Sequence, residues 1–210
     1  PDGTIVIEDG IIRSVGRTAE IMRNLDVSHY EVIDALDRAV LPGFVDSHTH
    51  FIFGGYRAEE FSWRLQGMSY MDIMAQGGGI ANTVEATRKA TKEELIDLGK
   101  KRLDSMLAFG VTTVEGKSGY GLDHDTEIKQ LVAMGDLDAA HPIDIARTFL
   151  GAHAVPGDYR GNEDGFIEYL IQEVLPAVAH KNLAEFCDIF CEKGVFSVNQ
   201  SRRLLENARS

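Results

Sequence analysis

The chain has 210 residues, of which 44% are hydrophobic and 26% are charged, and its net charge of -12 gives a sequence pI near 5.0. This composition is ordinary for a globular protein with a sizeable core, and the acidic balance argues against a surface that binds nucleic acid or an anionic membrane. No apolar run approaches the roughly 20 residues that cross a bilayer, and the N-terminus has no signal-peptide pattern.

The first 36 residues differ from the rest in having a β pattern. Residues 3–16, GTIVIEDGIIRSVG, predict two short β-branched strands around Asp9-Gly10, a dipeptide typical of a hairpin turn. The β character continues through residues 30–40, YEVIDALDRAV.

From Val40 onward the chain alternates short apolar strands with amphipathic helices, which is typical of βα units and a parallel sheet. Four such units make half of a (β/α)8 barrel, so the chain is either an open four-stranded sheet or part of a larger protein, and we favour the second. The clearest helix begins at a capping box of Thr91 and Glu94 and ends at Gly110. The expected strands are 40–50, 111–121, 143–155 and 186–196; the expected helices lie within 58–74, 91–110, about 125–137, about 163–174 with a stop near Pro176, and from Ser197 to beyond Ser210, with a loop at 76–80.

Polar residues gather where the expected strands end. His48 and His50 lie at the end of the first expected strand, residues 117–120 near the end of the second, His153 near the end of the third, and Glu192 near the end of the fourth. In parallel α/β folds the carboxyl ends of the strands carry the active site, so this placement predicts a functional site.

His48 and His50 lie at positions i and i+2 of what the sequence predicts to be a buried strand. Such residues share one face, so the two imidazoles can converge on one metal ion, and Asp46 on the same face can orient one of them. The alternative is a hydrogen-bonded histidine pair that caps the strand, since two ligands do not complete a metal site.

Three further residues are candidates for binding a ligand. Arg57 carries a planar fork suited to a carboxylate, although a solvated arginine is the simpler interpretation. Tyr120 lies between two glycines that allow close approach to a ligand, and a packed loop tyrosine is the alternative. His153 ends an apolar strand, where a core histidine is the competing interpretation. Lys117 and Glu192 fit either the site or a strand-end ion pair.

The two cysteines, Cys187 and Cys191, lie in one apolar segment and are interpreted as small buried hydrophobes. They cannot form a disulfide framework, which favours a reducing, cytoplasmic setting. The glycines at 77–79 fit a lid or a helix end equally well.

Longer segments carry a family resemblance. LPGFVDSHTH resembles the first barrel strand of the amidohydrolase superfamily, and IVIEDGIIRSVG resembles the small β domain that precedes the barrel in these enzymes. HTHFIFGGYRAEEF, AQGGGIANTVEATRKAT, KSGYGLD, FLGAHAVP and FCEKGVF together resemble the imidazolonepropionase family, from Val40 over essentially the whole chain. The resemblance implies an α/β fold in which residues 1–39 are part of a small N-terminal β domain and residues 40–210 are the first half, about four βα units, of a TIM-like (β/α)8 barrel.

The resemblance also implies hydrolysis of the cyclic amide of 4-imidazolone-5-propanoate to N-formimidoyl-L-glutamate in histidine degradation, with one Zn or Fe ion. It makes His48 and His50 metal ligands, and Arg57, Tyr120 and His153 binding residues for this small-molecule substrate. His153 would also act in catalysis by stabilising charge on the carbonyl oxygen. The family's remaining metal ligands, a histidine and an aspartate, and its catalytic glutamate are expected beyond Ser210.

Other functions remain open from the sequence. One is a different cyclic amidohydrolase or a deaminase of the same superfamily, and another is an inactive metal-binding fragment. A homodimer is also left open.

Overall fold

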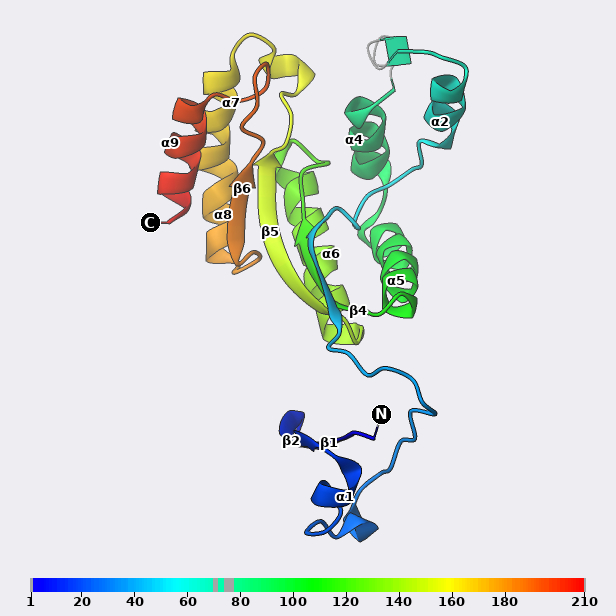
Figure 1. Cartoon of the computed structure of the whole chain (residues 1–210). Helices are drawn as coiled ribbons and strands as arrows, with labels where there is room; N and C mark the ends of the chain where they lie inside the picture. Colours follow the sequence, from blue (N-terminus) through cyan, green and yellow to red (C-terminus); the bar gives the residue numbers. More distant parts are fainter. Residues whose placement is uncertain (1, 70–71, 74–77, 210) are drawn as a thin grey trace. The chain divides into compact units, whose positions relative to one another are not determined.

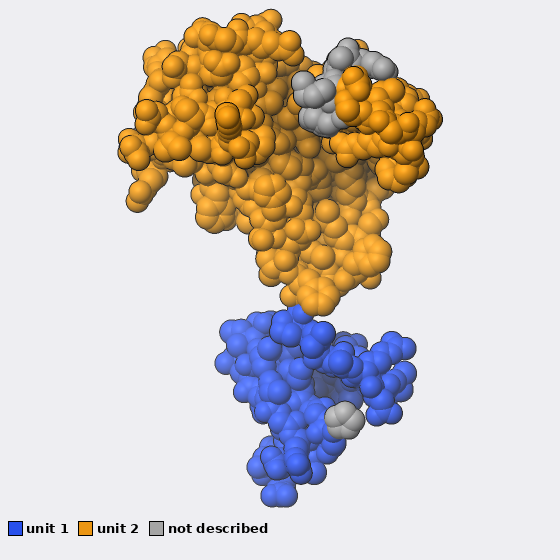
Figure 2. All heavy atoms as spheres, turned by 45° about the horizontal axis from the view of Figure 1, so that its top comes forward, with its two compact units in different colours: residues 1–42 blue, residues 43–210 orange. Residues whose placement is uncertain are grey.

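The computed structural model describes residues 2–69, 72–73 and 78–209. The chain divides into two compact units, residues 1–42 and 43–210 (Figure 2). Within the described residues, no helix has both the length and the apolar character needed to cross a membrane.

The first unit contains the predicted hairpin. Strands β1 (Thr4–Glu8) and β2 (Ile11–Gly16) pair antiparallel, with Glu8 opposite Ile11. Asp9 and Gly10 connect them with φ angles of 50° and 73°, the left-handed conformation that a two-residue hairpin turn requires. A short helix, α1 (Thr18–Ile21), and a 3-10 turn, η1 (Val27–His29), follow.

The predicted β character of residues 30–40 is wrong. The segment contains no strand, and Ile33 is 83% exposed. The Asp34 carboxylate accepts a hydrogen bond from the Leu36 amide, and Leu36 and Asp37 have φ angles of 50° and 61°. A turn therefore interrupts the segment, and β-branched residues do not form a strand without a neighbouring strand to pair with.

The second unit is an α/β structure built on one parallel sheet, as predicted. Its strands lie in the order β3-β4-β5-β6, so each pairs with the next one along the chain, which is the arrangement of half of a (β/α)8 barrel (Figure 1). The strands are β3 (Phe44–Thr49), β4 (Val111–Lys117), β5 (Asp144–Ala152) and β6 (Phe186–Ile189). The helical segments are α2 (Ala58–Leu65), α4 (Ile80–Lys89), α5 (Lys92–Ala108), α6 (His124–Ala140), η2 (Gly157–Tyr159), α7 (Glu163–Tyr169), η3 (Leu170–Val174), α8 (Leu175–His180) and α9 (Val198–Ala208).

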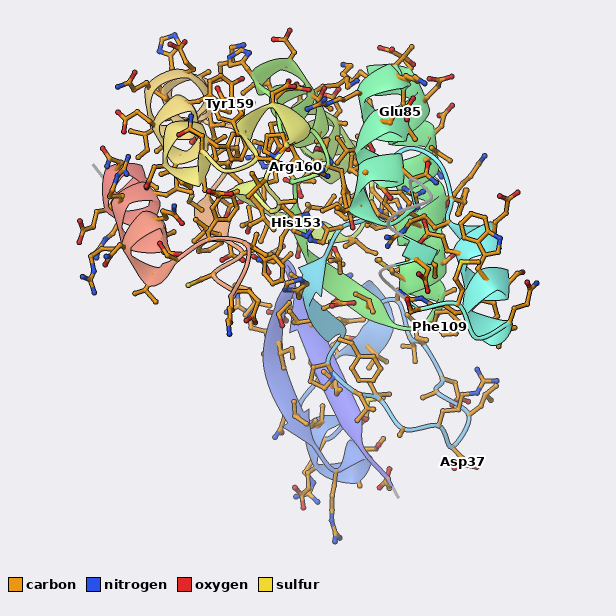
Figure 3. The ribbon with its side chains drawn as sticks, turned by 90° about the horizontal axis from the view of Figure 1, so that it is seen from above. Asp37, Glu85, Phe109, His153, Tyr159 and Arg160 are labelled. Carbon is orange, nitrogen blue, oxygen red and sulfur yellow. The ribbon has the colours of Figure 1, made fainter. Side chains whose placement is uncertain are left out.

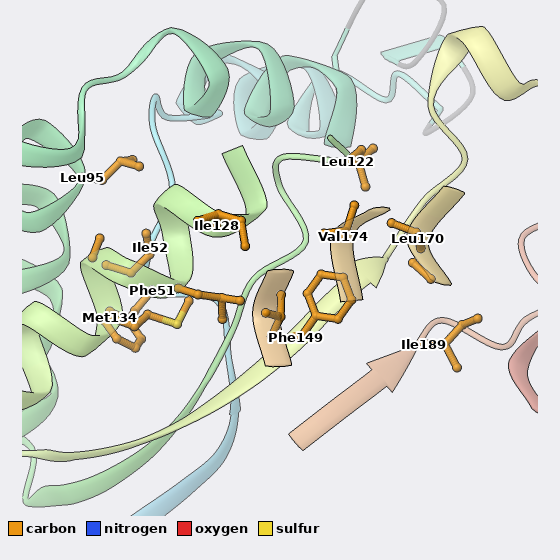
Figure 4. Packing of buried hydrophobic residues seen from close by; sticks show 14 of the residues in the cluster. Phe51, Ile52, Leu95, Leu122, Ile128, Met134, Phe149, Leu170, Val174 and Ile189 are labelled. Carbon is orange, nitrogen blue, oxygen red and sulfur yellow. The ribbon is translucent and has the colours of Figure 1, made fainter. Parts of the chain in front are cut away.

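The hydrophobic core of this unit lies between the sheet and its helices (Figure 4). Side chains alternate along each strand, so Val114, Ile145 and Phe149 face this layer and are almost completely buried. Met134 of α6 and Phe51, which follows β3, pack against them. The opposite face of β4 and β5 carries polar side chains, among them Glu115 and Thr148, together with the buried Leu150.

Strand β3 is not the buried strand that the sequence predicts. Phe44 and Val45 are 55% and 67% exposed, and Phe186 on β6 is 57% exposed. The reason is topological, because β3 and β6 form the two edges of the four-stranded sheet. Each has a neighbouring strand on only one side among the residues that the structure describes.

The predicted helix with the capping box is confirmed. The Thr91 hydroxyl accepts a hydrogen bond from the Glu94 amide, and the Glu94 carboxylate accepts one from the Thr91 amide. Gly110, at φ 86°, follows the end of α5.

Other helix boundaries differ from the prediction. Helix α4 was not expected, although buried Thr83, Val84 and Thr87 give it an inward face. The helix within 58–74 is present as α2, and Met74 lies outside the described residues. Helix α9 ends at Ala208 rather than running through Arg209 toward Ser210.

The helix that begins at Glu163 does not stop near Pro176 but continues to His180. A π-helical turn, η3, lies just before the proline, and the Leu175 amide bonds the Leu170 carbonyl five residues back. Proline has no N–H and its ring collides with the carbonyl four residues earlier in a regular helix. The wider π turn accommodates it at the start of α8.

Candidate active site at the carboxyl ends of the strands

The structure brings four of the five predicted site residues together at the carboxyl ends of three strands. His48 and His50 come from the end of β3, Tyr120 from the loop after β4, and His153 from the residue after β5. The His50 ring stacks on the His153 ring at 4.5 Å between centroids, and Tyr120 lies 5.0 Å and 5.2 Å from these two rings. Figure 3 looks down on this end of the sheet, with His153 near its centre.

The two histidines that the sequence predicts to bind a metal lie close together, and one of the two rings is largely buried. The two ring centroids are 5.8 Å apart, and Nδ1 of His50 is buried with no hydrogen-bond partner among the described residues. Burial, together with repulsion from the cationic forms of the neighbouring His153 and His48 rings and from Lys117, lowers the pKa of His50 to about 3. The ring is therefore neutral at physiological pH and keeps a free lone pair, the state that a metal ligand requires. The described residues contain no group of three or more histidine, cysteine, aspartate or glutamate side chains arranged to hold a metal ion.

Asp46 lies beside the pair, but its contact is with the backbone. Its carboxylate accepts a long hydrogen bond of 3.4 Å from the His48 amide. No hydrogen bond joins this carboxylate to the ring of His48 or His50, so its predicted role in orienting a histidine ring stays a prediction.

His153 is held by the loop that carries Tyr120. Its Nδ1 lies 3.0 Å from the Gly119 carbonyl oxygen, which can only accept, so Nδ1 carries the proton. Burial lowers the pKa of His153, an effect that the Gly119 carbonyl opposes. The neutral ring therefore offers an Nε2 lone pair. Gly119 has φ +110°, and a Cβ there would lie 2.8 Å from the His153 Cβ, so only glycine permits this approach.

Arg57 precedes α2 and is half-exposed. Its Nη1 lies 3.9 Å from a Glu60 carboxylate oxygen, a loose ion pair that leaves the fork able to bind an anion. Burial raises the pKa of Tyr120, and the charge of Arg57 opposes this rise, so the two side chains interact electrostatically.

Glu60 is a site-supporting residue that the sequence did not reveal. It is buried, and its carboxylate accepts a hydrogen bond of 2.8 Å from the Gly79 amide in addition to the ion pair with Arg57. The sequence left open whether residues 77–79 form a lid or a helix end, and Gly77 of this segment lies outside the described residues. Gly79 itself forms the N-terminal cap of α4.

Arg102 of α5 fixes the segment between the histidine pair and Arg57. Its Nη1 donates to the carbonyl oxygens of Phe51 and Phe53 at 2.8 Å and 2.9 Å, and its guanidinium lies 3.6 Å from the centre of the Phe53 ring. The signal in the sequence was an arginine at a position of the apolar stripe of α5, where a charged residue needs a specific reason.

Lys117 forms the strand-end ion pair that was one of its two predicted roles, within a charged cluster on the sheet face that lies opposite Val114 and Phe149. The buried Lys117 ammonium is 2.7 Å from the Glu115 carboxylate and 2.9 Å from the Asp188 carboxylate. Thr148 donates to the same Glu115 oxygen at 2.6 Å, so the cluster joins β4, β5 and β6. Glu192 is not part of this ion pair, and its carboxylate accepts from the adjacent Lys193 amide.

Replacing Lys117 with methionine is expected to lower the free energy of unfolding by about 3 kcal/mol, because it leaves two carboxylates without their cation. Burial alone would lower the pKa of Lys117, but the ion pairs outweigh it and raise the pKa, so the lysine is charged. Urea unfolding measures the effect. Lys101→Met on the exposed side of α5 is the control, and equal unfolding midpoints for the two variants would show that the cluster adds no stability.

The prediction that both cysteines are small buried hydrophobes fits Cys187, which is partly buried, but is wrong for Cys191. Burial, together with the charge of Asp188, raises the pKa of Cys187 to about 12, so this thiol behaves as an inert, partly buried side chain. Cys191 is exposed, because the chain leaves the sheet at Ile189 and runs over the surface before α9. Both cysteines are free thiols.

Comparison with known proteins places this site in a family context. The profile of the amidohydrolase family matches residues 31–147, more than half of the chain. The chain is 60% identical to an imidazolonepropionase of Clostridium tetani and 58% identical to one of Parabacteroides distasonis, in each case over 99% of this chain and 50% of the relative. It is 55% identical to an imidazolonepropionase of Phocaeicola vulgatus over its whole length and 50% of that protein. The chain therefore spans about half the length of the curated relatives that it matches.

Proposed function

Because the chain belongs to the amidohydrolase family, we propose that it is the first half of a metal-dependent hydrolase that opens the ring of 4-imidazolone-5-propanoate to give N-formimidoyl-L-glutamate, a step of histidine degradation. The observation that carries the proposal is the mutual contact of the His50, Tyr120 and His153 rings beside His48. Identities of 55% to 60% with three imidazolonepropionases support the choice of substrate.

We propose that His48 and His50 hold one Zn or Fe ion. The neutral His50 ring and its unpartnered buried nitrogen fit this role. When bound, the metal supplies a Lewis acid for the ring carbonyl and a water of lowered pKa. Since two histidines are half of a tetrahedral set, the other ligands and the general base come from outside these 210 residues, as the half-length match to the relatives supports.

The other residues recognise the substrate. Arg57 pairs with the propanoate carboxylate, for which its half-exposed fork is suited. Tyr120 packs against the substrate ring. His153 presents an Nε2 lone pair when neutral, so we assign it the acceptance of a hydrogen bond from a ring N–H. The expected role of His153 in stabilising charge on the carbonyl oxygen needs a hydrogen-bond donor at Nε2, which the protonated ring would supply, and it stays a prediction.

The test is turnover by the complete protein, loaded with Zn or Fe, of 4-imidazolone-5-propanoate and of two cyclic amides without a propanoate arm, hydantoin and dihydrouracil. Loss of imidazolone absorbance and appearance of N-formimidoyl-L-glutamate by mass spectrometry are expected with the first compound only. Turnover of another cyclic amide, without turnover of the imidazolone, would overturn the proposal. The 210-residue chain alone is expected to be inactive.

A further inference from the structure

In the loop Ser118–Leu122, which we term the Tyr120 loop, most backbone amides are held by side chains of α6. Its four consecutive amides, from Gly119 to Leu122, all donate to two residues of that helix. Glu127 accepts from Gly119 at 3.0 Å through Oε2, and from Gly121 at 2.8 Å and Leu122 at 2.9 Å through Oε1. Gln130 accepts from Tyr120 at 3.2 Å.

Glu127 is an unusual residue to find on the buried face of a helix. Its side chain is fully buried, and among the described residues the groups that act on its pKa are a hydroxyl and backbone amides rather than a cation. Burial raises its pKa, while the Ser118 hydroxyl and the loop amides act in the opposite direction. Every partner is a donor, so the site is built for a carboxylate that only accepts. Burying such a group is costly unless all its hydrogen bonds are made.

Gln130 connects the Tyr120 loop to the histidine pair. It is fully buried, and its amide nitrogen donates to the Ile52 carbonyl at 2.8 Å, two residues after His50. The Gly119 carbonyl, whose own amide is held by Glu127, is the acceptor for His153 Nδ1. Two neighbouring side chains of one helix therefore determine the placement of segments from three strand ends.

We propose that Glu127 and Gln130 are positioning residues, which set the substrate-binding geometry of Tyr120 and His153 through the backbone of the Tyr120 loop. The expected change in KM rests on the proposed function, because it assumes that the imidazolone is the substrate. Its structural consequence, the fixed tautomer of His153, holds whatever the substrate is.

The sharpest variant is Glu127→Gln in the complete protein. The amide has the same shape, but its NH2 group must face at least one loop amide, so one accepting position becomes a donor. We expect KM for the imidazolone to rise about tenfold, the size of effect of losing a hydrogen bond to a charged group. A merely structural role would reduce the folded fraction and the apparent kcat while leaving KM unchanged. Glu93→Gln, the same change at an exposed position of α5, is the control and should change neither.

Nitrogen-15 NMR of the histidines gives a readout independent of activity. In the wild type and in Glu93→Gln, His153 should be found with its proton on Nδ1, and in Glu127→Gln as a mixture of tautomers. If Glu127→Gln does not fold, Gln130→Met, which removes both amide bonds without adding charge, takes its place with the same expectations. An unchanged His153 tautomer in a folded variant overturns the inference. A wild type without imidazolone turnover refutes the proposed function instead, and the NMR comparison then decides the inference alone.

Discussion

Replacing Arg57 with alanine is expected to raise KM for 4-imidazolone-5-propanoate about 100-fold, with a much smaller change in kcat. The reason is the loss of a charge-assisted pair with the substrate carboxylate, worth about 3 kcal/mol, far from the bond that is hydrolysed. Steady-state kinetics of the complete enzyme measure the effect. Because the ion pair of Arg57 with Glu60 is long and half-exposed, the unfolding midpoint should barely move.

Two further variants sharpen this result. Arg57→Lys keeps the charge but loses the planar fork, so its KM should fall between those of the wild type and the alanine variant. Arg202→Ala removes an exposed arginine of α9 that has no assigned role in the site, and it should leave KM unchanged. A KM within about twofold of wild type for Arg57→Ala, less than one hydrogen bond is worth, would remove Arg57 from the site.

The second large effect is expected at the histidine pair. His48→Ala and His50→Ala should each weaken metal binding by at least about 100-fold, because each removes one of few ligands. The measurement is metal content after dialysis against a chelator of graded concentration, followed by turnover. His50 should be the more sensitive position, since its ring is buried against His153 and Tyr120, whereas His48 is exposed.

The matched control is His29→Ala, which removes an exposed histidine of the first unit and should leave the metal content unchanged. The 210-residue chain alone should bind the metal weakly, since two imidazoles fill only half of a tetrahedral site. Full metal content in both alanine variants would contradict the assignment of these ligands.

Strand-end reasoning predicted most of the candidate site. It needs only the order of strands and the rule that parallel strands place their carboxyl ends at one edge. It therefore placed His50, Tyr120 and His153 together although more than 100 residues separate the first from the last. The helical period and a capping box were likewise sufficient for α5, whose signals are local.

What the sequence could not reveal depends on partners distant in the chain or on topology. Glu127 and Gln130 look like ordinary polar residues of an amphipathic helix until the loop amides that they accept from are in place. The exposure of Phe44 follows from the edge position of β3, which no local pattern encodes. The rule that proline ends a regular helix predicted a stop near Pro176, but the π turn before it lets the helix continue.

The contacts of Arg102 and Gln130 with residues 51–53 also bear on the order in which the molecule folds. They join groups 51, 49 and 78 residues apart in the chain. Contacts of such long range form after local structure, because the entropy of closing a long loop must be spent before the contact is gained. The backbone beside His50 thus acquires its geometry only when α5 and α6 have docked on the sheet. A metal ion that meets the chain earlier finds two flexible imidazoles, so we expect ion binding at the proposed site to follow the docking of these helices rather than to precede it.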